Sequence, residues 1–95
     1  MKNILITADI LLKNGFENNI FVSSDEFTYK SYTLWTKDKE PLKIDMIYKH
    51  TNNGSNWYMH IDNNYCETIG SADIDYIEQF NLMMKVFNSN FNLTI

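Results

Sequence analysis

Apolar and charged side chains alternate along residues 42–49. Leu42, Ile44, Met46 and Tyr48 occupy the even positions, and Lys43, Asp45 and Lys49 occupy odd positions, with Ile47 as the apolar exception among the odd ones. A period of two is typical of a β-strand with one buried face. Phe27–Trp35 and Trp57–Ile61 are rich in aromatic and β-branched residues and predict two further strands. Tyr65–Gly70 is expected to return as a fourth strand.

Two turn signals set a register between these strands. Asn53–Gly54 is typical of a two-residue hairpin loop, and Asn63–Asn64 suits a second one. With these loops, Met46 lies opposite Ile61, and Ile61 lies opposite Cys66. The predicted core face then carries Leu42, Ile44, Met46, Tyr48, Trp57, Met59, Ile61 and Cys66.

Helical patterns flank the predicted strands. Thr7 is suited to cap a short helix that ends at Asn14–Gly15. Near the C-terminus, apolar residues at spacings of three and four predict a second helix, capped by Ser71 or Asp73. Its apolar stripe is Ile74, Ile77, Phe80, Met84 and Phe87. The asparagine-rich tail, residues 88–95, either frays or adds a short strand.

We therefore predict a single α+β domain over residues 1–95. A three- to four-stranded antiparallel sheet forms a meander, and an N-terminal and a C-terminal helix pack on one face of it. Residues 17–26 form a loop or a short edge strand. A chain of 95 residues with 44% hydrophobic content can bury one modest core.

Composition narrows the function classes. The net charge is −4, and the eight basic residues are all lysines. Without arginine, the usual partner of phosphate and guanine, direct nucleic-acid binding is not expected. No apolar run approaches the ~20 residues that span a membrane, and the N-terminus has no cleavage site typical of a signal peptide. We expect a cytoplasmic protein with no membrane segment.

Candidate chemistry is sparse. In the predicted register, His60 lies opposite Glu67 on the face that also carries Asp62, which suggests a proton-transfer pair or a weak metal site. One histidine and two scattered carboxylates are a poor zinc set, and sheet faces often carry such pairs. Cys66, the only cysteine, falls on the other face and is expected to be a small buried residue. We expect no catalytic residue, no cofactor and no metal.

The face opposite the core is the candidate binding surface. Its candidate protein-binding residues are Ile47, Tyr58, His60, Tyr65, Glu67 and Ile69. Tyrosines and isoleucines mixed with charges are typical of a recognition surface. Two interpretations remain open. Either this face contacts a protein partner, or it is covered by side chains of the first strand, by the tail or by a second subunit.

The stretch MHIDNNYCETIGSADIDYIEQFN, together with the earlier LLKNGFE, resembles small single-domain proteins of Bacteroidetes bacteria and of their phages and mobile elements. The resemblance covers both ends of the domain and is weak through residues 20–56. It implies no catalytic residues. Small proteins of such elements include anti-CRISPR proteins, so it implies an inhibitor of a bacterial immune nuclease.

The function classes can be ranked. The first is a non-enzymatic protein-binding module that occupies a surface of its partner. The second is an RNA- or single-strand-binding module with Tyr58, Tyr65 and Tyr32 as stacking platforms, which the acidic charge opposes. A small enzyme using His60 and Glu67 ranks last. A homodimer built on the same face is compatible with all three.

Overall fold

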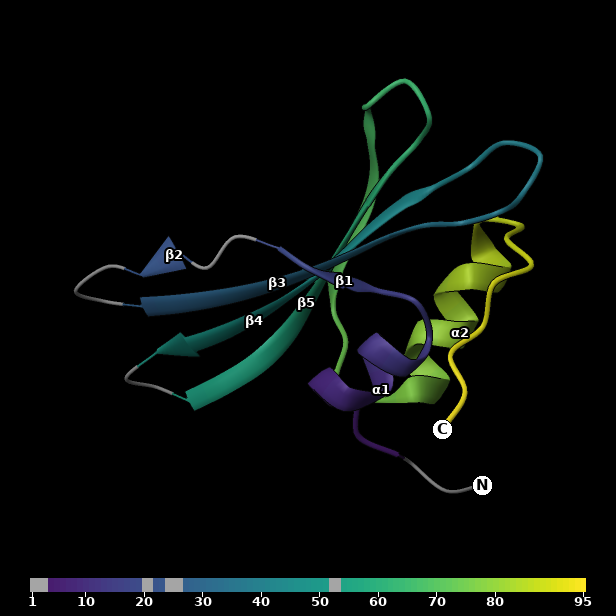
Figure 1. The fold of residues 1–95 in the computed structure, drawn as a ribbon. Coiled ribbons are helices and arrows are strands. Elements are labelled where there is room, and N and C mark those ends of the chain that lie inside the picture. The colour runs from purple at the N-terminus through teal and green to yellow at the C-terminus, as the bar shows by residue number, and fades with distance from the viewer. Residues whose placement is uncertain (1–3, 20–21, 24–26, 52–53) are drawn as a thin grey trace.

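Figure 1 shows the computed structural model, which describes residues 4–19, 22–23, 27–51 and 54–95. Along the chain its elements are α1 (Ala8–Lys13), β1 (Glu17–Asn18), β2 (Val22–Ser23), β3 (Phe27–Trp35), β4 (Lys43–Thr51), β5 (Gly54–Asp62), β6 (Thr68–Asp73) and α2 (Ile77–Val86). Within the described residues, six strands form one antiparallel sheet in the order β1-β3-β4-β5-β6, and β2 also pairs with β3. The α+β class and the antiparallel meander of β3 to β6 are confirmed. The short strands β1 and β2 lie within residues 17–26, where a short edge strand was one of the two predicted alternatives, and they extend the sheet beyond three or four strands.

The core lies between one face of the sheet and the two helices. β4 and β5 place Ile44 opposite Ile61 and Met46 opposite Met59, and all four side chains are 0% exposed. Burial of each such side chain contributes roughly 1.5–3 kcal/mol. The helices complete the same buried cluster with Leu11 of α1 and with Phe80 and Met84 of α2. Both helices therefore cover the same face of the sheet.

The hairpin between β4 and β5 differs from the prediction at its loop. Thr51 pairs with Gly54, so Gly54 begins β5 instead of lying in an Asn53–Gly54 loop. Its φ of 130° is a conformation that glycine adopts without strain. Residues 52–53, which this pair encloses, lie outside the described residues. The partner of each β4 residue moves two positions along β5, and an even shift keeps every side chain on its predicted face.

α1 has the predicted bounds, whereas α2 begins later than predicted. Neither Ser71 nor Asp73 caps α2, because both belong to β6. The N-cap is Tyr76, and the Gln79 side chain folds back toward it. Gln79 Oε1 accepts hydrogen bonds from the backbone N–H groups of Asp75 and Tyr76, both at 3.0 Å. A side-chain amide thus satisfies backbone donors at the start of the helix, which is the role of glutamine or glutamate at the third helical position of a capping box.

The tail, residues 88–95, neither frays nor forms a strand. Leu93 is 2% exposed and belongs to the core. Asn81 Oδ1 accepts from the Leu93 N–H at 2.8 Å, and Asn81 Nδ2 donates to the Leu93 carbonyl at 3.2 Å. Asn14 binds the Thr94 backbone in the same reciprocal way, at 3.0 and 2.7 Å. These side-chain amides supply the donor and acceptor that a neighbouring strand would otherwise provide.

The loop between β3 and β4 is tied to the same tail. Asp38 accepts hydrogen bonds from the Ser89 hydroxyl at 2.6 Å and from the Asn90 backbone N–H at 2.8 Å. The Ser89 hydroxyl, followed by the Asn90 N–H, favours the carboxylate and lowers the pKa of Asp38 from its usual 3.8. The charged form therefore contributes stability above the unfolded-state pKa. This contribution is lost as the pH falls through the lower folded-state pKa.

Truncation of Leu93 tests whether the tail is part of the core. Leu93→Ala should lower the free energy of unfolding by about 2–4 kcal/mol, because a truncated buried leucine leaves a cavity. Ile95, two residues further on, is 76% exposed and provides the matched control. Ile95→Ala should change the free energy by less than about 0.5 kcal/mol. Urea denaturation followed by circular dichroism measures both, and equally small effects would contradict the assignment of Leu93 to the core.

Asp38→Asn tests the link between the tail and the loop. At about pH 7 the variant should unfold at a lower temperature than the wild type, because the carboxylate is lost. The difference should shrink as the pH falls through the lowered pKa of Asp38, where the wild type also loses its charge. Glu40→Gln changes an exposed acid of the same loop and should unfold like the wild type at every pH. A difference in unfolding temperature between Asp38→Asn and the wild type that stays constant over this pH range would refute the charged interaction.

Candidate functional site

The face of the sheet opposite the core is open in the described part of the chain, since both helices pack on the other face. We call it the outer face. Strand pairing determines its members, because directly opposite residues project to the same side of a sheet. Its members include Glu17 of β1, Ser31, Thr33 and Trp35 of β3, Lys43, Asp45, Ile47 and Lys49 of β4, Asn56, Tyr58, His60 and Asp62 of β5, and Thr68, Ser71 and Asp73 of β6.

Three of the six predicted site residues share the outer face. Ile47 and Tyr58 are direct cross-strand partners, and His60 lies two residues further along β5. All three side chains are partly buried. Lys49 Nζ lies 4.6 Å from the centroid of the Tyr58 ring, which adds a cation–π contact. The structure therefore brings the isoleucine and the first tyrosine of the predicted patch together at the centre of the sheet.

The other three predicted site residues, Tyr65, Glu67 and Ile69, do not lie among them. Tyr65 and Glu67 belong to the connection between β5 and β6, where Tyr65 is 77% exposed. Ile69 follows a shift in register between β5 and β6. It lines a groove together with Leu42 and Phe87, on the helix side of the sheet. The predicted patch is thus divided between three different surfaces.

The side chain of Asn63 explains the longer connection. Its Oδ1 accepts hydrogen bonds from the backbone N–H groups of Tyr65 at 2.9 Å and Glu67 at 3.0 Å. The Asn63 backbone N–H donates to the Glu67 carbonyl at 2.9 Å. Asparagine side chains compete with ladder hydrogen bonds in this way. The turn therefore extends to Glu67, and β6 begins at Thr68 instead of Tyr65.

The same turn overturns the prediction for Cys66. This residue is exposed and has a φ of 63°, so it does not face the core opposite Ile61. Gly70 occupies that position. A Cβ atom on Gly70 would lie 2.6 Å from Cζ of Phe87, so the close approach of the Phe87 ring favours glycine there.

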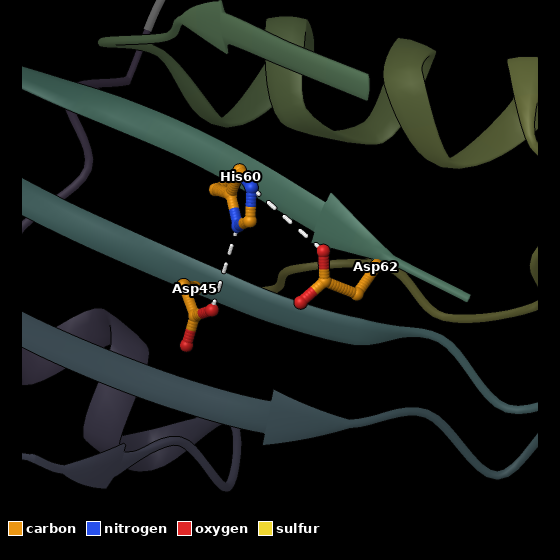
Figure 2. A group of neighbouring side chains, drawn as sticks. All are labelled: Asp45, His60 and Asp62. Carbon is orange, nitrogen blue, oxygen red and sulfur yellow. Dashed lines mark ion pairs between the residues drawn. The ribbon is translucent and has the colours of Figure 1, made fainter. Parts of the chain in front are cut away.

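His60 lies between two carboxylates on the outer face (Figure 2). Asp45 is its direct partner on β4, and Asp62 follows two residues later on β5. His60 Nδ1 is 3.7 Å from Asp45 Oδ2, and His60 Nε2 is 3.7 Å from Asp62 Oδ1. The predicted pairing of His60 with Glu67 is wrong, because the longer turn places Ser71 opposite His60. The sequence did not predict Asp45 as the neighbour of His60, because the predicted register of β4 against β5 was shifted by two residues.

Two threonine hydroxyls orient these carboxylates. Thr33 Oγ1 donates to Asp45 Oδ1 at 2.6 Å, and Thr68 Oγ1 donates to Asp62 Oδ1 at 3.2 Å. Thr68 Oγ1 also lies 3.0 Å from His60 Nε2. Since the Thr68 proton is directed to Asp62, the His60 Nε2–H donates to Thr68. In this arrangement the imidazole does not act as a base toward the threonine hydroxyl.

The three tyrosines considered as stacking platforms are not assembled on one face. Tyr32 is buried in the core, where its ring centroid is 5.8 Å from that of Trp57. Tyr65 lies on the turn after β5. Tyr58 is therefore the one member of this set on the outer face. These three rings therefore do not form a row of stacking platforms of the kind that single-stranded nucleic acids use.

Near Trp35, the outer face adjoins a groove with a volume of about 830 Å³. Trp35 lines it and is 49% exposed, a large apolar side chain accessible to a partner. Glu17 and Asn19 on the β1 side and Phe91 of the tail line other parts of the groove. An exposed apolar ring thus lies at the end of β3, on the wall of this groove.

Comparison with protein-family models, curated proteins and solved structures finds no match for this chain. Among the residues that the structure describes, no helix has both the length and the apolar character needed to cross a bilayer. Function is therefore inferred from the geometry and chemistry of the site.

Substitutions of Cys66 test the turn. Cys66→Asn should retain the free energy of unfolding to within about 0.5 kcal/mol, because asparagine tolerates the left-handed conformation. Cys66→Val should lower it by about 1–2 kcal/mol, because a β-branched side chain is strained there. A buried strand position would reverse this order, since it accepts valine and rejects an unpaired amide. Urea denaturation of the two variants decides between the placements.

Proposed function

We propose that this domain is a non-enzymatic protein-binding module and that the outer face of the sheet is its contact surface. The observation that carries the proposal is the Ile47–Tyr58 pair, which lies on the two central strands of β3 to β6 with no helix over it in the described structure. Aromatic and aliphatic side chains in this position are suited to anchor a partner.

Polar groups surround this apolar centre. Ser31 and Asp73 extend the same row on β3 and β6, and Lys49 and His60 flank it along the strands. An apolar centre with a polar rim is the usual composition of a protein interface, in which the rim excludes water from the anchors. A rigid sheet also presents its side chains with little loss of conformational entropy on binding.

The charge of the chain supports one class of partner. Its net charge is −4, and the outer face carries Asp45, Asp62 and Asp73 against Lys43 and Lys49. An acidic surface complements a basic one and accelerates association with it. Together with the resemblance to proteins of phages and mobile elements, this supports a bacterial immune nuclease, whose nucleic-acid channel is basic.

Affinity capture from a Bacteroidetes host, read by mass spectrometry, identifies the partner. Tagged wild type should retain a protein, and Tyr58→Ala should retain much less of it. RNA captured in place of protein would favour the nucleic-acid alternative. A complex containing two copies of this chain and no other protein would favour the homodimer.

Binding of the purified partner then tests the outer face directly. Tyr58→Ala should weaken the complex by about 2 kcal/mol, or roughly thirtyfold in Kd, because central aromatic anchors carry much of an interface energy. Tyr65→Ala is the matched control, since Tyr65 is an exposed tyrosine off this face. It should bind like the wild type. Circular dichroism confirms that both variants fold, and normal binding by folded Tyr58→Ala would move the contact surface elsewhere.

A further inference from the structure

We propose that Asp45, His60 and Asp62 form a site that binds a divalent transition-metal ion and prefers Zn²⁺ to Ca²⁺ and Mg²⁺. The proposal concerns a site that the protein-binding function does not require. Asp45 and His60 are directly opposite each other, and Asp62 is two residues beyond His60, so three donor side chains from two strands project from one face (Figure 2). Their donor atoms all lie within 4.8 Å of one another.

The gap between His60 and Asp45 has the right chemistry for a cation. With its Nε2–H donated to Thr68, a neutral His60 turns the lone pair of Nδ1 toward Asp45 Oδ2, 3.7 Å away. This separation is longer than a hydrogen bond, which reaches about 3.2 Å. Two electron-pair donors thus face each other across a space that a shared metal ion would fill.

The distance between His60 and Asp45 requires little rearrangement. Zn²⁺ binds histidine nitrogen and carboxylate oxygen at about 2.0–2.2 Å, which places tetrahedral donors about 3.3 Å apart. His60 Nδ1 and Asp45 Oδ2 are 3.7 Å apart and need to close by a few tenths of an ångström. Asp62 lies beside Nε2, with Oδ1 3.7 Å from it, so its side chain has to rotate toward Nδ1 to reach the same ion. The β4–β5 ladder keeps the backbone positions fixed while this happens.

The surroundings are those of an oriented ligand set. The Asp45 and Asp62 side chains are only 16% and 14% exposed, so their charges are partly removed from water. Thr33 holds one oxygen of Asp45, which leaves Oδ2 turned toward His60, and Thr68 holds Asp62. Groups that orient metal ligands in this way typically change metal affinity 10–100-fold when they are removed.

The donor set selects the class of metal. Imidazole suits Zn²⁺ and other later transition metals, whereas Ca²⁺ and Mg²⁺ prefer oxygen donors alone. Three protein ligands leave a zinc ion with a further position for water or for a group from a partner. We therefore expect Zn²⁺ to bind at least tenfold more tightly than Ca²⁺ or Mg²⁺.

The ammonium group of Lys43 competes with a metal ion for this site. Its Nζ lies 4.0 Å from Asp45 Oδ2, the oxygen that faces His60. A metal ion and the ammonium group cannot both occupy this position without repulsion. Replacing Lys43 by methionine retains most of the apolar stem and removes the charge. Lys43→Met should therefore bind Zn²⁺ more tightly than the wild type.

Isothermal titration with ZnCl₂ tests the proposal on the intact chain. The wild type should take up one Zn²⁺ saturably, and His60→Gln and Asp45→Asn should each weaken binding at least tenfold. His50→Gln is the matched control, because His50 lies on the same sheet outside this cluster and bonds Ser55. It should bind like the wild type. Absence of saturable binding, equal binding by His60→Gln, or a preference for Ca²⁺ would each overturn the proposal.

Proton NMR of the wild-type protein tests the proposal without depending on whether a variant folds. The chain has two histidines, so their imidazole resonances are readily distinguished. Zn²⁺ should shift or broaden the resonances of His60 and leave those of His50 unchanged. A response confined to His50, or no response at either ring, would overturn the proposal in the wild-type protein itself.

Discussion

The buried pairing of β4 with β5 is the constraint on which the rest of this structure depends. Ile44 packs opposite Ile61 and Met46 opposite Met59, and none of these side chains is exposed. Because side chains alternate along a strand, the burial of these pairs places every intervening residue on the other face. Ile47, Tyr58, His60, Asp45 and Asp62 meet on the outer face for this reason. The candidate site is thus a geometric consequence of the core.

The length of one turn decides which residues join that site. The Asn63 side chain captures two backbone N–H groups, and the turn after β5 therefore continues to Glu67. This removes Tyr65 and Glu67 from the sheet and brings Thr68 beside His60. A hydrogen-bonded pair of strands with a shorter loop would have assembled a different set of polar groups. Local side-chain to backbone bonding thus outweighed the continuation of the ladder.

Amide side chains have a consistent structural role where regular elements end. Gln79 accepts the donors at the start of α2, and Asn81 and Asn14 hold the tail against the helices. Each replaces a backbone partner that a cap or a strand would normally supply. The asparagine-rich tail is therefore compatible with an ordered C-terminus, because its partners are amides elsewhere in the chain. The sequence alone left fraying and a short strand as alternatives, since it carries no information about such distant partners.

The spacing of apolar residues by itself determined the α+β class, and the alternation of apolar and charged residues determined the central strands and the two faces of β4 and β5. These predictions survived an error in the hairpin register, because an even shift leaves each side chain on its face. Only the tertiary structure decided which side chains are neighbours, namely that His60 meets Asp45 rather than Glu67 and that Cys66 is exposed. The physical reason is that side-chain direction follows a local period of two. Neighbours across strands depend on turn lengths, which the hydrogen bonds accepted by the Asn63 side chain and the conformation of Gly54 set in the folded chain.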